Sequence, residues 1–193
     1  MKVRVPFIPL KGQTFFPNTI VGFDIGRDKS LKSLDAAMSE DKHLIVATQR
    51  DISINAPKEE DIFTTGVEIR VKQVIKRHEE YVRVLAECVN RIRLSAVYDE
   101  DDTLYCDYEV LDTISEETYE LNVIALVRVL KETYFSYVEM SNSGEAAARA
   151  LIDGVEDPVE LAYTIAGELA VPFDVLQGLL ELNSADELIE QLI

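Results

Sequence analysis

Residues 66–74, GVEIRVKQV, alternate apolar and polar side chains at every second position. Val67, Ile69 and Val71 fall on one face, and the charged residues between them fall on the other. A half-buried strand shows this alternation because successive side chains point to opposite faces of a sheet. The same pattern recurs in residues 81–88 (YVRVLAEC), 90–97 (NRIRLSAV) and 104–110 (LYCDYEV). The stretch therefore predicts that the first half of the chain is β-structure.

Three further strand-like segments precede this stretch, at residues 4–10, 19–25 and 43–48. The short polar breaks HEE and DEDD suit antiparallel connections between the later strands. Between the early strands, apolar residues recur at spacings of three and four over residues 27–38, which predicts one helix. The first half is expected to be a small β-barrel or sandwich of about seven strands with one inserted helix.

A helical period replaces the alternation in the second half of the chain. Apolar residues at helical spacing mark one face of a long helix over residues 123–138, with Ser115 as its expected N-cap. The stretches DPVE at 157–160 and SADE at 184–187 each place a Glu three residues after a capping side chain. These signals predict a bundle of four or five helices. The chain stops at ELIEQLI without a cap or polar tail, so we expect the last helix to continue beyond Ile193.

The charge also differs between the halves. Residues 1–98 carry 16 basic and 13 acidic side chains, a balance of +3, whereas residues 99–193 carry 3 and 23, a balance of −20. The acidic half would repel nucleic-acid phosphates and an anionic membrane surface, so neither partner is expected. We therefore predict an α+β protein with a β-domain over 1–113 and an acidic helical bundle over 114–193. No apolar run approaches the length of a membrane span, and the start is unlike a signal peptide, which favours a cytoplasmic location.

Residues 22–30, GFDIGRDKS, nearly spell a phosphate-binding loop. The glycines are too close together, and Arg27 and Asp28 displace Lys29 and Ser30 from the positions that such a loop requires. A capped helix start explains the same letters, with Asp28 at the positive end of the helix dipole. The stretch therefore predicts no nucleotide site.

The remaining reactive residues form no recognisable motif. His43 and His78 are the only histidines, and neither lies in a hydrolase signature. DEDD at 99–102 lacks the glycine and distal glutamate of a calcium loop, so a solvated hairpin tip is favoured over a cation site. Cys88 and Cys106 have no metal spacing and are expected to be buried free thiols. The residues alone predict a non-catalytic binding module with no metal or cofactor.

Four motifs in the first half follow one another in a distinctive order. They are PLKGQTFFPNTIVGFDIGRDKSLKSLDAAM from residue 9, IVATQRD from 45, EEDIFTTGVEIRVKQVIK from 59 and VRVLAECVNRIRL from 82. Together with the acidic helical half, this order resembles the N-terminal domain of the ATP-dependent protease Lon over essentially the whole chain. Two departures are the hairpin tip RHEEY at 77–81 and Cys88, where the family often has glycine. Either departure would alter local turn geometry rather than the fold.

The resemblance implies a PUA-like β-barrel followed by a helical bundle. In the family this region engages misfolded and selected regulatory proteins, as the front of a hexameric enzyme with an AAA+ ATPase and a Ser–Lys protease. ATP and Mg²⁺ serve those later parts, whose motifs this sequence lacks. The implied role is substrate recognition without catalysis, with unfolded or degron-bearing proteins as partners.

Apolar loop residues are the candidate substrate contacts under this resemblance: Phe15, Phe16, Pro17 and Phe63. Their alternative role is to cap the core of the barrel. Arg27, Asp28 and Lys29 at the first helix start are candidates for a subunit or partner contact, or are simply a solvated helix end. Two other functions stay open: a stand-alone adaptor or small-ligand receptor of the same fold, and RNA binding by the +3 half.

Overall fold

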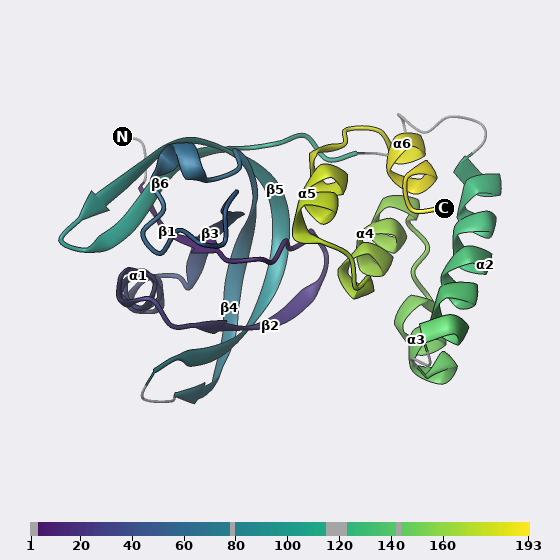
Figure 1. Ribbon diagram of the computed structural model, residues 1–193, viewed down its shortest axis with the longest axis horizontal. Coiled ribbons are helices and arrows are strands. Elements are labelled where there is room, and N and C mark those ends of the chain that lie inside the picture. Colours follow the sequence, from purple (N-terminus) through teal and green to yellow (C-terminus); the bar gives the residue numbers. More distant parts are fainter. Residues whose placement is uncertain (1–3, 78–79, 115–122, 142–143) are drawn as a thin grey trace.

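The computed structural model describes residues 4–77, 80–114, 123–141 and 144–193. A sheet-rich half and a helical half lie side by side along the longest axis (Figure 1). The strands are β1 (Val5–Leu10), β2 (Ile20–Ile25), β3 (His43–Thr48), β4 (Thr65–Arg77), β5 (Val82–Glu100) and β6 (Thr103–Val110). The helices are α1 (Asp28–Ser39), the 3-10 turn η1 (Glu59–Asp61), α2 (Val123–Ser141), α3 (Glu145–Ile152), α4 (Pro158–Glu168), α5 (Phe173–Glu181) and α6 (Ala185–Glu190). The mixed α and β composition confirms the predicted fold class.

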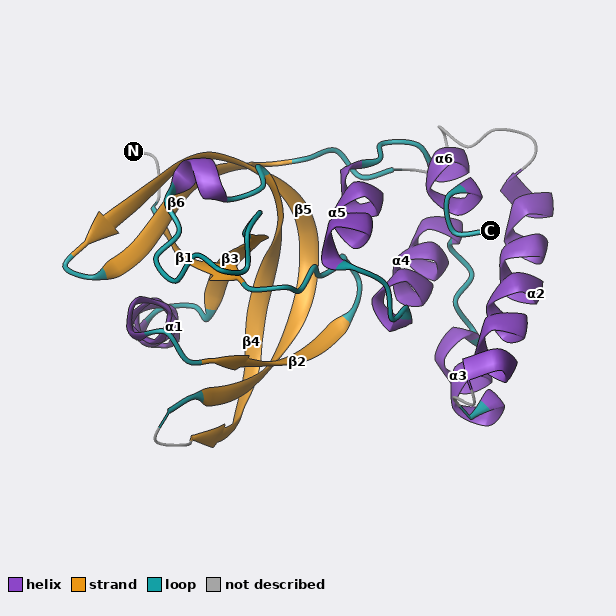
Figure 2. Cartoon of the chain, in the orientation of Figure 1, coloured by secondary structure: helices purple, strands orange, loops and turns teal. Residues whose placement is uncertain are grey.

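The six strands form one sheet in the order β2-β5-β4-β3-β1-β6 (Figure 2). Strand β6 also pairs with β5, so the pairing of β1, β3, β4, β5 and β6 returns on itself, and among the described strands β2 pairs only with β5. The later strands are antiparallel, as expected from their short connections. Strands β1 and β3 are parallel, and β2 and α1 together form the crossover between them. The sequence did not indicate this parallel pairing.

The predicted strands 81–88 and 90–97 form a single strand, β5, so six strands are present in the described chain rather than about seven. Regular alternation stops where Arg91 and Ile92 are both buried. At this point β5 changes its neighbour: residues 82–87 pair with β2, and residues 92–100 pair with β6. The break between the two predicted strands therefore marks a change of partner within one strand.

Helix α1 confirms the helix predicted over 27–38. Its Leu34 and Ala37 are fully buried, and the helix packs against β1 and β6. In the second half, α2 confirms the long helix, and the described residues of this half form five α-helices, α2 to α6. Both predicted caps of the later helices are present, with the Glu160 amide bound to Asp157 and the Glu187 amide bound to Ser184.

Two expectations about helix ends have different outcomes. The expected cap Ser115 lies outside the described residues. The last helix, α6, ends at Glu190, so residues 191–193 are not helical, contrary to the prediction that the chain stops inside a helix.

The main hydrophobic core runs without a break from the sheet into the helices. Polar groups also join the two halves: buried Gln177 of α5 donates to the Thr65 carbonyl at 3.0 Å, and Thr14 donates to the Phe173 carbonyl at 3.1 Å. The guanidinium of buried Arg91 donates to backbone carbonyls at the end of α5. The helical half is therefore packed against the sheet, and the division into domains at residues 1–113 and 114–193 stays a prediction.

Candidate functional site

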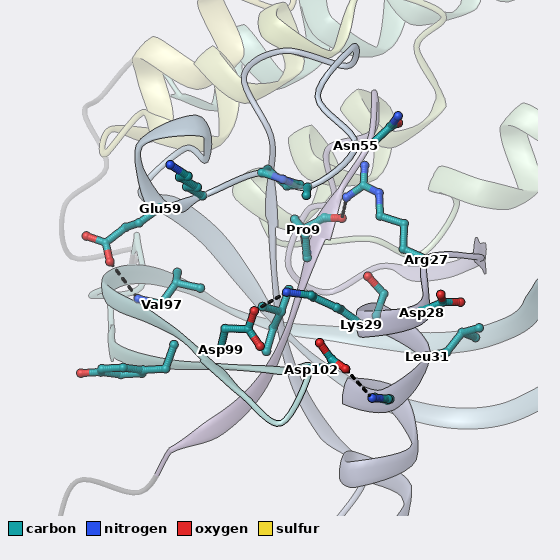
Figure 3. A pocket seen from close by; sticks show the side chains of 17 residues that line it. Pro9, Arg27, Asp28, Lys29, Leu31, Asn55, Glu59, Val97, Asp99 and Asp102 are labelled. Atoms are coloured by element: carbon teal, nitrogen blue, oxygen red, sulfur yellow. Dashed lines mark hydrogen bonds and ion pairs between the residues drawn. The ribbon is translucent and has the colours of Figure 1, made fainter.

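Two grooves hold five of the seven candidate contact residues. The first, the α1 groove, lies between the start of α1, residues 55–59 and the β5–β6 hairpin (Figure 3). Its volume is about 930 Å³. Lys29, Pro57, Tyr98 and Leu104 are among the side chains that line it, so its wall is partly apolar and partly charged. This size lies within the range of small-ligand sites.

Arg27 fixes one end of the α1 groove. As the N-cap residue of α1, it turns its guanidinium back to the carbonyl of Pro9 at 3.3 Å and to the side-chain oxygen of Gln49. Gln49 is fully buried, and its amide donates to the carbonyls of Asp51 and Ile54. Burial lowers the pKa of Arg27. Arg27 thus donates to uncharged acceptors, and through Gln49 it holds the start of α1 against the loop that follows β3.

Ion pairs close the opposite side of the α1 groove. Lys29 binds Asp99, and Lys32 lies 3.1 Å from Asp102. The hydrogen bond to Asp99 raises the pKa of Lys29, and the hydrogen bond from Lys32 lowers the pKa of Asp102. Asp101 and Asp102 have positive φ values of 51° and 62°, as a two-residue hairpin turn requires. The hairpin tip predicted for DEDD is confirmed, and its exposed ion pairs are screened by solvent.

The phosphate-loop-like stretch 22–30 forms the end of β2 and the first turn of α1. Only Gly26 and Arg27 separate the two elements, which leaves no loop long enough to surround a phosphate. Exposed Asp28 puts a negative charge in the first turn of the helix. These residues do not fit a nucleotide. Arg27, Asp28 and Lys29 do lie together in the α1 groove, and their contact with a partner stays a prediction.

The second groove, the β2 groove, lies between residues 12–22 and helices α3, α4 and α5, with a volume of about 720 Å³. Phe15 and Phe16 contribute to its floor but are only 7% and 1% exposed. The ring of Phe15 meets the edge of Phe23 at 5.0 Å between centroids, and Phe16 stacks on Tyr163 of α4 at 5.5 Å. The contact of Phe16 with Tyr163 joins the sheet-rich half to the helical half.

Phe15, Phe16 and neighbouring Pro17 are all buried. Their positions agree with the alternative role, in which these residues cap the core. Their direct contact with a substrate stays a prediction. Phe63 is half-buried and lines neither groove. The guanidinium of Arg50 lies 4.4 Å from the centre of its ring.

Sequence reasoning missed the accessible residues of the β2 groove. Ile20 is 68% exposed on β2, and Leu151 of α3 is 39% exposed. Glu160 and Glu168 of α4 are the charged residues of the lining, and no ion pair joins either to a basic side chain within the described chain. The sequence did contain a signal that Ile20 would be exposed, because the alternation along β2 places Ile20 on the face opposite to buried Phe23. No signal indicated that α3 and α4 would lie beside it.

Of the two histidines, His43 lines neither groove. His43 lies 3.1 Å from the Glu68 carboxylate and 3.4 Å from the Tyr108 hydroxyl, where it belongs to a polar cluster on the sheet. His78 lies outside the described residues. Within the described parts of the chain, no group of His, Cys, Asp and Glu side chains could hold a metal ion.

Cys88 and Cys106 are buried free thiols, as predicted. Burial raises the pKa of the Cys88 thiol to about 12 and raises that of Cys106 as well. At pH 8 we expect neither thiol to react with a disulfide reagent until the protein unfolds, because the thiolate is the nucleophile.

The same shifts predict how stability depends on pH. Above about pH 9 the unfolded thiols ionise while the folded ones stay protonated, so the free energy of unfolding falls as the pH rises towards 12.

Thiol titration at pH 8, with and without denaturant, tests the expected lack of reactivity of Cys88 and Cys106 in the folded chain. Rapid reaction of the folded chain at pH 8 would contradict it.

Comparison with known proteins decides the family. The profile of the ATP-dependent protease La (LON) substrate-binding domain matches residues 4–193. The chain belongs to this family. It is 29% identical over 193 residues to Lon protease 1 of Bacillus subtilis, covering 100% of the chain and 25% of that protein. It is 32% identical to the Lon protease of Bacillus thuringiensis over 98% of the chain and 24% of that protein.

Solved structures of the Lon N-terminal domain share the fold. The domain of a Mycobacterium avium complex Lon protease superposes with a TM-score of 0.80 at 18% identity, over 99% of this chain and 96% of that one. The domain from Xanthomonas campestris gives 0.68 at 13% identity, over 98% and 96%. The chain spans about a quarter of the length of the curated Lon relatives it matches. Among the described helices, none has the length and apolar character needed to span a bilayer.

Proposed function

We propose that this Lon substrate-binding domain captures exposed apolar segments of unfolded or degron-bearing proteins and that it carries no catalysis. The observation that carries the proposal is the β2 groove. It joins accessible apolar side chains, Ile20 and Leu151, to a buried aromatic floor within the family's substrate-binding domain. Exposed apolar side chains that gather along a groove favour contact with apolar partners.

The charge of the domain sets which apolar segments would bind best. Glu160 and Glu168 line the β2 groove, and the helical half carries most of the net charge of −17. Segments that combine apolar and basic residues would therefore be preferred, and salt would weaken the electrostatic part of their binding.

The remaining parts of the proposal concern the whole protease. The ring of strands is interpreted as the PUA-like barrel of the family. Proteolysis by a Ser–Lys dyad, ATP and Mg²⁺ binding, and hexamer formation are assigned to chain outside this domain, in a cytoplasmic enzyme that degrades misfolded and selected regulatory proteins. Several weak domains on one ring would raise the local concentration of a client without requiring tight binding by each copy.

Replacement of Ile20 with Ser tests the β2 groove. We expect the affinity for a fluorescent, permanently unfolded protein to fall about 5-fold, because an apolar contact is lost. The melting temperature should change little, since Ile20 is 68% exposed. Fluorescence anisotropy measures the affinity, and calorimetry measures the melting temperature.

Ile75→Ser is the matched control. Ile75 is also a strand isoleucine, 49% exposed on β4, but it lines neither groove. Its replacement should leave the affinity unchanged. Equal losses in the two variants would mean that binding is spread over exposed apolar residues and is not located in the β2 groove.

A further inference from the structure

The outer edge of β2 carries backbone groups without a strand partner. Within the described residues, β2 pairs only with β5, in a regular antiparallel register without a bulge. The Cys88 amide donates to the Thr19 carbonyl at 2.9 Å, which fixes Thr19 as a bonded position. Because bonded and non-bonded positions alternate, the amides and carbonyls of Ile20, Gly22 and Asp24 point away from β5. All three residues are exposed.

The other edge of the same part of the sheet is protected against strand pairing. Strand β3 pairs with β4 only as far as Arg70, so the end of β4 beyond it has no second neighbour among the described strands. Two register shifts interrupt this end of β4, and Lys72 and Lys76 are exposed on it. Bulges and lysines are the usual means by which proteins prevent an edge strand from pairing. Strand β2 has neither a bulge nor a lysine nor a proline.

The unprotected part of this edge opens onto the β2 groove. Ile20, Val21 and Gly22 belong to the groove lining, together with apolar residues of α3, of α5 and of the segments that flank α4. A strand added beside β2 would therefore place alternate side chains against this lining. The carboxylates of Glu160 and Glu168 lie in the same groove and would attract a basic side chain of the added strand.

We propose that the free edge of β2 binds an extended client segment by strand addition, with backbone hydrogen bonds to Ile20, Gly22 and Asp24. The segment has apolar side chains at alternate positions and carries Lys or Arg. This inference rests on the proposed function and adds the mode of binding. Recognition through the backbone explains how one domain accepts many sequences, because every extended segment offers the same amides and carbonyls.

Gly22 allows a matched pair of variants. A Cβ atom at Gly22 would lie 3.8 Å from both Arg83 Nη2 and the Val84 carbonyl oxygen, which is ordinary contact, so Gly22→Ala keeps the fold and the amide donor. Gly22→Pro removes the amide that points to the free edge, a place where an edge strand tolerates proline. We expect Gly22→Pro to weaken binding of a short Leu- and Lys-containing peptide about 10-fold and Gly22→Ala to leave it nearly unchanged.

Methylation of the peptide backbone provides a test that leaves the protein intact. Two versions of the peptide carry N-methyl groups on alternate amides, one on each of the two sets. Side-chain alternation fixes which set faces β2, so strand addition predicts that one version loses about 10-fold in affinity while the other binds almost normally. Hydrogen exchange by NMR should show that the peptide protects the amides of Ile20, Gly22 and Asp24 in the unmodified chain.

The outcomes separate the two proposals. Failure of the unmethylated peptide to bind would overturn the proposed function. Strand addition alone would be overturned if the unmethylated peptide binds, both methylated versions have the same affinity, and the amides along β2 show no alternate protection. If Gly22→Pro unfolds, the methylated peptides and the exchange pattern still decide the question.

Discussion

Gly66→Ala should be among the most damaging single-methyl changes in the described chain, lowering the free energy of unfolding by about 3 kcal/mol or more. Gly66 is buried in β4, and a Cβ atom there would lie 2.3 Å from the Val46 carbonyl oxygen and 2.9 Å from the Ala47 Cβ. These atoms belong to β3 and cannot move away without disturbing the pairing of β3 with β4. Denaturant unfolding monitored by circular dichroism measures the loss.

Gly178→Ala is the control for Gly66→Ala. Gly178 lies inside α5, and nothing lies within 4 Å of an added Cβ atom. Alanine there should stabilise the chain by about 0.5–1 kcal/mol, because glycine is the poorer helix former. If Gly66→Ala were as stable as the parent chain, the close approach of β4 to β3 would be wrong.

Arg91→Met should destabilise the chain by about 3 kcal/mol, and the melting temperature should fall by roughly 10 °C. Arg91 is 6% exposed on β5. Its guanidinium donates to the Leu180 carbonyl at 3.2 Å, to the Leu182 carbonyl, and to the Asp112 carbonyl at 3.3 Å. Methionine fills similar space but leaves these buried carbonyls without a donor. Calorimetry measures the change.

Arg93→Met is the matched control on the same strand. Arg93 is exposed and pairs with exposed Glu109 at 3.2 Å, an arrangement that contributes little to stability in water. Its replacement should leave the melting temperature nearly unchanged. Equal effects of the two variants would contradict the role of Arg91 in joining the end of α5 to the sheet.

Much of the local structure could be predicted from the sequence because its causes are local. The period of apolar residues identified the strands and α1, and the caps Asp157 and Ser184 marked the starts of α4 and α6. Each cap needs only a side chain and an amide three residues further along the chain.

The pairing of distant segments could not be predicted in the same way. Nothing in the pattern of β1 shows that it pairs in parallel with β3, and the burial of Arg91 depends on where α5 ends. Both grooves are built from segments that lie far apart in the sequence, so their residues have no common spacing. The resemblance to Lon identified the family, but it did not indicate that Phe16 would stack on Tyr163 of the helical half.

The most direct measurement compares one client protein in two states with this chain. The client is labelled with a fluorophore and is held unfolded by reduction and alkylation, or left native. We predict saturable binding of the unfolded client at low salt, with a dissociation constant of roughly 10–500 μM for a single domain, and no binding of the native client. No binding of the unfolded client at about 1 mM chain, or equal binding of both states, would contradict the proposal that this domain recognises unfolded substrates.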